Sequence, residues 1–513
     1  MTFEGAYDYI IIGAGAAGCV IARRLSDNPD STVLLLEAGD PDDDPAIARI
    51  DVPSLLSLWR PDLDWGYSTE EEPGLNGRRM PVLQGKVLGG STATNGRIYI
   101  RGNRRDYDHW NYLGNEGWSY SDVLPYFKKS EDYEGGESEF HGVGGPLSIR
   151  DLPQATSAAQ AFVEAAMELG FKGPPWDFNG ARQEGAASFC QSTTTRELTR
   201  ASTSAAFIHP IMGRPNFELH TNAFATRLLL EGERCVGVEY QQSGILHRVQ
   251  ALTEVIVSAG AFASPKLLLL SGIGPAENLR SHGIPVVVDL PGVGKNLQDH
   301  LLVRVSYTCR QEQPVPILIS EASLFTYTRS ALDAASPNLQ FFFGGFVFPD
   351  LAANGPGFTT CPIVTQPQSI GSVSLRSSDP SELSVVRFNY LSSDLDMQVL
   401  LDGVALAREL IHARAFDGLR GQELIPGPEV ANERQLREYI QNNCITDWHP
   451  CGTCKMGYDR MATVDPQLRV YGISGLRVAD ASIMPTITNC NLNSTCIMIG
   501  EKAADLILTE QSK

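Results

Sequence analysis

The first forty residues constrain the fold more strongly than any other part of the chain. The segment "YDYIIIGAGAAGCVIARRLS" is an apolar run, then Gly13, Gly15 and Gly18 in a G-x-G-x-x-G pattern, then a helical pattern. The next apolar run, "STVLLLEAGD", contains Glu37 at the spacing of roughly 20 residues that this motif has for a ribose-binding acid. This order predicts a βαβ unit in which the glycines admit a pyrophosphate and Glu37 accepts hydrogen bonds from a ribose. The alternative is a glycine-rich structural turn.

Length and charge narrow the class of protein. The chain has 513 residues, so we expect two or three domains. The net charge of −19 argues against nucleic-acid binding, which needs clustered Lys and Arg. No apolar run is long enough to span a membrane, and the first predicted strand starts too close to Met1 for a secretory leader. We therefore expect a cytoplasmic protein with ten reduced cysteines; nothing here indicates an oligomeric state.

Other glycine-rich segments repeat the pattern of strand, turn and helix. "GLRVADASIMP" predicts a strand ending in Asp480, and "NLNSTCIMIGEKAADLIL" predicts a helix; together they can bracket the other end of a long dinucleotide. "VLQGKVLGGSTATNGRIYIRG" predicts a loop with exposed amides, and "EVIVSAGAFASPKLLLLSGIG" predicts a strand, a turn and a helix opened by Ser264-Pro265. In "PGVGKNLQDH", His300 is interpreted as a hydrogen-bonded structural residue rather than a ligand.

Two stretches, 157–211 and 301–444, lack these glycine patterns. They contain mixed strands such as "NLQFFFGGFVF" and the helical pattern "DMQVLLDGVALARELIHARAF". We predict that they form one substrate-binding domain inserted in two pieces. The remaining residues, 1–156, 212–300 and 445–513, then form the dinucleotide-binding domain.

Taken in chain order, "IIIGAGAAG", "EAGD", "GKVLGGSTATN", "NRRDYDHW", "AGAFASPKLLLLSGIGP", "GVGKNLQDH", "WHPCGTCKMG" and "GLRVADASIMPTI" make a longer pattern. In this set the sequence resembles the glucose–methanol–choline (GMC) flavin oxidoreductase family nearly end to end, and is similar to its aryl-alcohol and hydroxymethylfurfural oxidases and choline dehydrogenase-like members. The resemblance implies an α/β, Rossmann-like, doubly wound FAD-binding domain with an inserted α+β substrate domain containing an antiparallel sheet. It also implies oxidation of an alcohol, with oxygen or another acceptor reoxidising the flavin.

The resemblance also assigns the FAD site. The residues at the family's FAD-contacting positions are Gly13, Gly15, Ala16, Ala17, Glu37, Ala38, Trp65, Val87, Gly90, Thr94, Asn95, Gly96, Ala225, Trp448, Asp480, Ala481, Asn491 and Leu492. Some members attach FAD covalently to a histidine at the position of Thr94, so FAD is expected to be non-covalent here. Two departures are Leu492, in what is often Asn-Thr-Asn, and Cys451, where many members have an aliphatic residue.

The stretch "TDWHPCGTCKMG" carries the expected chemistry. The resemblance places His449 at the reactive edge of the flavin opposite Asn493. An imidazole of ordinary pKa can take a hydroxyl proton at neutral pH, and the Asn493 amide can donate to a developing alkoxide. A metal site is not expected, because the sequence has no H-x-x-x-H or paired C-x-x-C set. Cys451 and Cys454 have thiol–disulfide spacing, and the alternative is that both are buried and inert.

The expected reaction is oxidation of a primary alcohol to the aldehyde by proton abstraction and hydride transfer to flavin N5. In "NLQFFFGGFVF", Phe341 and Phe343 should face one side of a strand and Phe342 the other, with a bulge at glycines 344 and 345. Aromatic rings on the cavity side favour aromatic or allylic alcohols over choline and sugars. The alternatives are a cyanohydrin-cleaving lyase or a fatty-acid photodecarboxylase on the same fold, and an FAD-binding protein without activity.

Overall fold

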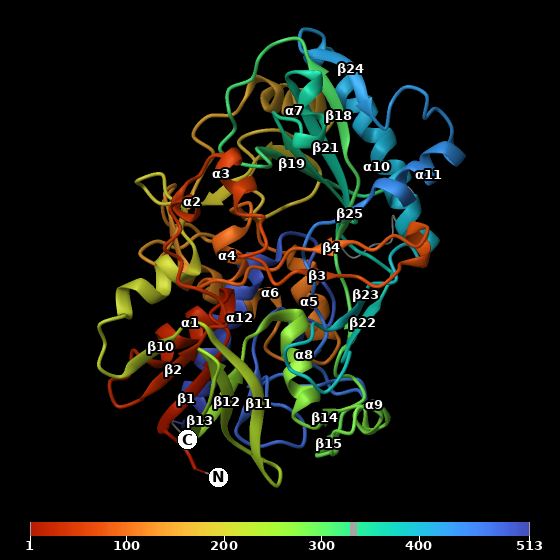
Figure 1. The fold of residues 1–513 in the computed structure, drawn as a ribbon. Coiled ribbons are helices and arrows are strands. Elements are labelled where there is room, and N and C mark those ends of the chain that lie inside the picture. The colour runs from red at the N-terminus through yellow and green to blue at the C-terminus, as the bar shows by residue number, and fades with distance from the viewer. Residues whose placement is uncertain (1, 329–335, 512–513) are drawn as a thin grey trace.

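The computed structural model describes residues 2–328 and 336–511, and two large sheets organise them (Figure 1). In the described residues the first sheet is seven-stranded, in the order β10-β2-β1-β13-β12-β11 with β26 also on β13. Its strands are β1 (Gly5–Ile12), β2 (Val33–Leu36), β10 (Phe217–His220), β11 (Ala223–Glu231), β12 (Arg234–Gln242), β13 (Ile245–Val257) and β26 (Leu476–Val478). The pairs among β10, β2, β1, β13 and β26 are parallel, whereas β11 and β12 add an antiparallel edge.

Continuous apolar runs form the centre of this sheet because both of its faces are covered. The residues Ile10 and Ile11 of β1 and the whole of β2 are fully buried or nearly so. Helices α1 (Ala16–Leu25) and α12 (Leu492–Gln511) pack closely here, since a Cβ added at Gly500 would lie 2.7 Å from the Ala17 carbonyl oxygen. The two ends of the chain therefore build one nucleotide-binding layer.

The second large sheet is antiparallel and eight-stranded in the described residues. Its strands are β8 (Ala186–Phe189), β17 (Leu301–Leu302), β18 (Val305–Cys309), β19 (Ala322–Thr326), β20 (Leu339–Gly344), β21 (Gly357–Val364), β24 (Arg420–Ile425) and β25 (Ile445–Thr446). Helices α7 (Ser157–Glu168) and α10 (Asp394–His412) cover one face of it, with α11 (Glu433–Asn443) beside α10 (Figure 1). The opposite face lines a cavity between the parts of the chain that form the two sheets.

Smaller elements complete the molecule. They include α2 (Pro45–Ala48), α3 (Val52–Ser57), α4 (Ser91–Thr94), α5 (Arg104–Tyr112), α6 (Tyr120–Ser130), α8 (Gly260–Leu270), α9 (Ala276–Ser281), β3 (Tyr67–Ser68), β4 (Pro81–Val82), β5 (Ile98–Tyr99), β6 (Glu131–Tyr133), β7 (Leu147–Arg150), β9 (Gln191–Thr193), β14 (Ile273–Gly274), β15 (Val288–Asp289), β16 (Lys295–Leu297), β22 (Gly371–Ser374) and β23 (Val385–Arg387). None of the helices described is both long enough and apolar enough to cross a bilayer.

The predicted fold class is confirmed, a Rossmann-like α/β layer with a second part built on an antiparallel sheet. The predicted domain boundaries stay a proposal. Strands of the antiparallel sheet other than β25 fall within 157–211 and 301–444, but β9 pairs with β5 and β7, and β22 pairs with β16. Both inserted pieces therefore also contribute to small sheets shared with the rest of the chain.

The predicted start of helix α8 was wrong. The helix begins at Gly260 rather than at Ser264-Pro265, and Pro265 lies inside it. A proline cannot donate to the carbonyl four residues earlier, which is that of Ala261. The Thr453 hydroxyl donates to this carbonyl at 2.6 Å instead. A residue distant in sequence thus satisfies the carbonyl that the proline leaves without a donor.

Strand β20 shows the predicted alternation without the predicted bulge. Phe341 and Phe343 are fully buried, and Phe343 stacks on Phe162 of α7 with 4.7 Å between ring centroids. Phe342 faces the opposite side. The pairing with β21 continues in register to Gly344, opposite Thr359, and the strand ends there. The glycines therefore terminate the strand instead of distorting it.

Candidate active site

A cavity of about 340 Å³ runs from the carboxyl ends of β1 and β2 to the free face of the antiparallel sheet. Of the residues predicted to contact FAD, those that line it are Gly13, Gly15, Ala16, Ala17, Glu37, Ala38, Trp65, Gly90, Thr94, Asn95, Gly96, Ala225, Trp448, Asp480, Ala481, Asn491 and Leu492. Val87 does not line the cavity, because its fully buried side chain packs with Ile47, Leu58, Leu63 and Ala93. Its backbone carbonyl accepts a hydrogen bond from the Gly90 amide at 2.7 Å.

The end of the cavity beside α1 fits a dinucleotide. Gly15 is the N-cap of α1 and brings no side-chain cap, so the first amides of the helix remain free for an anion. A Cβ added at Gly15 would meet no protein atom within 4 Å, and it would project into the cavity. The Glu37 carboxylate accepts hydrogen bonds at 2.8 Å from the amides of Ala14 and Gly39. This acid is therefore fixed at the cavity edge, where the predicted ribose contact requires it.

Asp480 ties the other side of the cavity together. It follows β26, and its carboxylate accepts hydrogen bonds at 2.8 Å from the amides of Ser482 and Gly260. Gly260 has φ +84°, a conformation that favours glycine. The end of one parallel strand and the start of α8 thus meet at a single carboxylate.

His449 is held by its backbone in a short loop after β25. Trp448 has φ +58°, unusual for a bulky residue, and its amide donates to the Thr446 hydroxyl at 2.8 Å. The amide of His449 donates to the buried carboxylate of Asp299 at 2.7 Å. These bonds hold the strained turn and direct the imidazole into the cavity.

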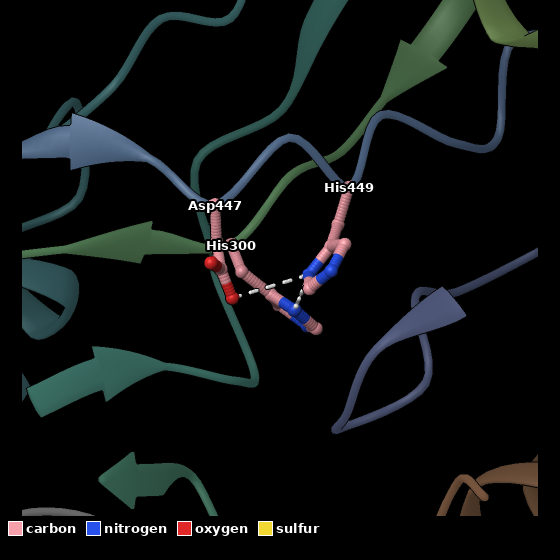
Figure 2. A group of neighbouring side chains, drawn as sticks. All are labelled: His300, Asp447 and His449. Atoms are coloured by element: carbon pink, nitrogen blue, oxygen red, sulfur yellow. Dashed lines mark hydrogen bonds and ion pairs between the residues drawn. The ribbon is translucent and has the colours of Figure 1, made fainter. Parts of the chain in front are cut away.

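The ring of His449 contacts two groups through its two nitrogens. Nδ1 lies 3.0 Å from Nδ1 of His300 (Figure 2), and Nε2 lies 3.2 Å from Nδ2 of Asn491. His300 is fully buried, which lowers its pKa to about 3 and keeps it neutral. It is hydrogen-bonded, and its partner is the ring of His449.

The neighbour of His449 is Asn491, whereas the sequence had paired it with Asn493. Asn491 precedes α12, and Asn493 lies in its first turn, about 200° further round the helix axis. Asn493 also lines the cavity, and its Oδ1 is buried with no hydrogen-bond partner among the residues described. The amide beside the histidine was thus missed by two positions.

Asp447 is a further side chain at this point that the sequence reading overlooked. Its Oδ2 lies 3.3 Å from Nδ1 of His449 (Figure 2), yet it forms no aligned hydrogen bond with any group of the described chain. Strand alternation could not have predicted this contact, because Trp448 between the two residues has φ +58° and the backbone there is not extended. His300, Asp447 and His449 have the donor types of a metal site, but the two Nδ1 atoms already bind each other. We describe the group as an acid–base cluster, and the absence of a metal stays a prediction.

The wall opposite the nucleotide end is apolar and aromatic. Leu302, Phe342, Cys361 and Ile445 pack together on it from β17, β20, β21 and β25. Phe346, Phe348 and Arg304 extend it. Arg304 forms a two-bond ion pair with Asp350 at 2.8 and 2.9 Å and lies 5.2 Å over the ring of Phe348. The cation of this wall is thus already paired.

Cys451 and Cys454 lie behind the histidine loop. Both are unpaired and fully buried, and burial raises the pKa of each thiol well above its ordinary value. A protonated, inaccessible thiol is a poor nucleophile. Their environment therefore favours the structural alternative.

The glycine arrangement gives a prediction for cofactor binding. Replacing Gly15 with Ala should keep the fold but lower FAD affinity about 10- to 100-fold, because the methyl group occupies cavity space and overpacking costs about 1–3 kcal/mol. Gly18→Ala is the contrast, since its Cβ would lie 1.9 Å from the Gly13 carbonyl oxygen and should destabilise the fold itself. FAD titration of the apoprotein and thermal unfolding separate the two effects. Unchanged FAD affinity in Gly15→Ala would contradict the assignment.

Comparison with known proteins agrees with this geometry. Residues 7–302 and 367–500 match the N- and C-terminal models of the family described as GMC oxidoreductase. An oxygen-dependent choline dehydrogenase of Brucella suis biovar 1 (strain 1330) is 42% identical, over 98% of this chain and 95% of that protein. The crystal structure of pyridoxine 4-oxidase from "Mesorbium loti" superposes with a TM-score of 0.90 at 32% identity, covering 97% and 98% of the two chains. A fungal aryl-alcohol oxidase superposes with a TM-score of 0.87 at 26% identity, covering 99% of each chain.

The family matches in both halves of the sequence agree with the two-sheet fold and with the glycine-lined cavity. The family models account for well over half of the chain, and the choline dehydrogenase relative spans nearly all of it. The chain belongs to the GMC oxidoreductase family, and it is an FAD-dependent enzyme that acts on the CH–OH group of alcohols.

Proposed function

We propose that this enzyme oxidises neutral primary alcohols of the aromatic or allylic type to aldehydes. The observation that supports this most directly is the position of His449 in a cavity whose facing wall is apolar and aromatic. FAD, when bound, supplies the acceptor for the hydride that leaves the alcohol carbon. The residues of the chain bind and orient the alcohol and move its hydroxyl proton.

In this proposal the free base is Nε2 of His449. Nδ1 of neutral His300 faces His449, and its Nε2 has no hydrogen-bond partner among the described residues, so we assign the single ring proton to Nε2. His300 Nδ1 then accepts the hydrogen bond from Nδ1–H of His449. The lone pair of His449 Nε2 is thereby left facing Asn491, whose amide can orient the hydroxyl and donate to a developing alkoxide.

The wall supports an aromatic or allylic substrate. Its rings and aliphatic side chains offer area burial, and ring pairs add on the order of 1 kcal/mol beyond burial. A benzylic or allylic position also weakens the C–H bond that releases hydride. Two structural relatives, named as pyridoxine 4-oxidase and aryl-alcohol oxidase, fit this class.

Choline is the second candidate, favoured by the 42% identity to oxygen-dependent choline dehydrogenases. A quaternary ammonium needs a carboxylate or free aromatic faces. The carboxylate of Asp350 is engaged by Arg304, and the same guanidinium lies over the ring of Phe348. Among the described residues, only the rings of Phe342 and Phe346 therefore remain on this wall for a cation. A second cation beside this guanidinium would be repelled, so we place neutral alcohols first.

We also propose that FAD is bound without a covalent link. Thr94 stands where some family members carry the attachment histidine, and its hydroxyl cannot form that bond. Acid precipitation should therefore release all of the flavin into the supernatant. Yellow colour that stays with the washed pellet would refute the proposal.

The catalytic assignment predicts a graded set of variants. His449→Ala should retain FAD and slow flavin reduction by about 10²–10⁴-fold, the usual contribution of a positioned base. Asn491→Ala should slow it by about 10²-fold, because a donor to developing charge acts mainly in the transition state. Asn493→Ala is the matched control, two positions away in the same cavity, and should have the smaller effect. Anaerobic stopped-flow measurement of flavin reduction compares the variants. A larger effect of Asn493→Ala than of Asn491→Ala would assign the donor role to Asn493.

Substrate class is tested by comparing kcat/KM for benzyl alcohol, furfuryl alcohol, choline and glucose. We expect the two neutral aromatic alcohols to exceed choline by about 10-fold or more, the equivalent of roughly 1.4 kcal/mol. Arg304→Met should narrow this difference by removing the cation from the wall. A clear preference for choline would discard the aromatic proposal. Absence of flavin reduction by every alcohol would support the lyase or photodecarboxylase alternative.

A further inference from the structure

We propose that Asp447 is a positioning residue for His449, and that the two side chains act as a single base. In this arrangement the Asp447 carboxylate holds the Nδ1–H of His449 while Nε2 takes the hydroxyl proton of the alcohol. The inference rests on the proposed function for its catalytic consequence. Its physical basis, a coupled acid–base pair, is measurable without turnover.

The Asp447 carboxyl group has one oxygen that lacks a hydrogen-bond donor in the described part of the chain. Asp447 and His449 both line the cavity, and Oδ2 of Asp447 lies 3.3 Å from Nδ1 of His449. This oxygen is buried, and it has no hydrogen-bond partner within residues 2–328 and 336–511. In the tautomer assigned above, the proton on Nδ1 of His449 points to Nδ1 of His300 instead, at an N–N distance of 3.0 Å. A small rotation of the imidazole exchanges one acceptor for the other.

The surroundings leave Asp447 as the acceptor available to neutralise a protonated His449. Asp299 is already used by the His449 amide, the Thr446 hydroxyl and the Tyr390 hydroxyl. His300 is neutral and offers only a lone pair. On the apolar wall of the cavity, the titratable groups are Cys361, which is a buried thiol, and Arg304, which is paired with Asp350.

Burial brings the pKa values of Asp447 and His449 closer together. It raises the pKa of Asp447, with help from the charge of Asp299, and it lowers the pKa of His449. Two groups that are ordinarily far apart in pKa then share one proton and titrate as a unit. The pair is neutral with that proton, and loss of the proton leaves a carboxylate beside a neutral imidazole. This second form is the base.

The proton balance of the step follows. The O–H bond of the alcohol breaks, and its proton binds Nε2 of His449. The hydride on the carbon that bears this oxygen would leave for FAD when the cofactor is bound. The Nδ1–H of His449 is then held by Asp447. The pair passes from one negative charge to none, so no unpaired cation is created in a buried site. With His300 alone, proton uptake would leave an imidazolium without a counter-charge.

The pH dependence of flavin reduction tests this directly. In the wild-type enzyme the rate constant should rise with pH and level off once the pair has lost its proton. Asp447→Asn should be slower by about 10²-fold or more, since an amide in place of the orienting carboxylate of a Ser-His-Asp triad costs about 10⁴-fold. Its rate should also vary less with pH between about 6 and 9 than the wild-type rate, because burial holds the pKa of the remaining His449 imidazole below its ordinary value. Asp447→Glu should restore part of both properties.

The controls separate this inference from the proposed function. Asp417→Asn makes the same change at an exposed surface pair with Arg420 and should keep the wild-type profile. Nitrogen-15 NMR of the His449 ring in the resting, FAD-loaded enzyme is the second readout. It should report a titration in the wild type that is lost in Asp447→Asn, whichever alcohol is the substrate. A wild-type rate and pH profile in Asp447→Asn, or an unaltered His449 titration, would overturn the inference.

Discussion

The buried carboxylate of Asp299 is the interaction on which the rest of the site depends. It accepts the amide of His449 and the hydroxyls of Thr446 and Tyr390, three donors that are far from it in sequence. A buried carboxylate is tolerated only while such donors remain in place. Strand β17 starts two residues later and pairs with both β21 and β25. One carboxylate thereby links the loop that carries His449 to the strand that starts the apolar wall.

The two ends of the cavity differ in the groups that they present. At the nucleotide end, Gly15 keeps a side chain out of the cavity, and Gly13 and Gly90 allow close backbone packing against Ser258 and Gly15, so that backbone amides can approach an anion. At the histidine end, three titratable side chains are crowded together where burial disfavours charge on each of them. Crowding of this kind is expected where a proton must be taken up and released near neutral pH. The polar chemistry is therefore concentrated opposite an otherwise apolar wall.

Family membership does not select the alcohol. Relatives with this fold are named for choline, pyridoxine and aryl alcohols, and this chain resembles all of them over nearly its full length. In our proposal, substrate choice depends on cavity-lining side chains such as Phe342 of β20 and Arg304, which lies between β17 and β18. Sites grafted on a shared fold vary in this way while the cofactor layer stays constant. The wall is for this reason the part of the molecule that carries the proposal.

The sequence by itself determined the nucleotide layer, because its signals are local: the spacing of Gly13, Gly15 and Glu37 acts within one βαβ unit. It also determined that Phe342 faces away from Phe341 and Phe343, since alternation along a strand is a property of the backbone, but not which of the two faces lines the cavity. Only the tertiary structure decided that Asn491 rather than Asn493 meets His449, that Thr453 lets α8 start early, and that Asp447 faces the imidazole. The first two of these contacts form because segments distant along the chain come within a few ångströms of each other, and the third depends on the turn at Trp448. The periodicity of residues along the chain carries no information about that proximity or that turn.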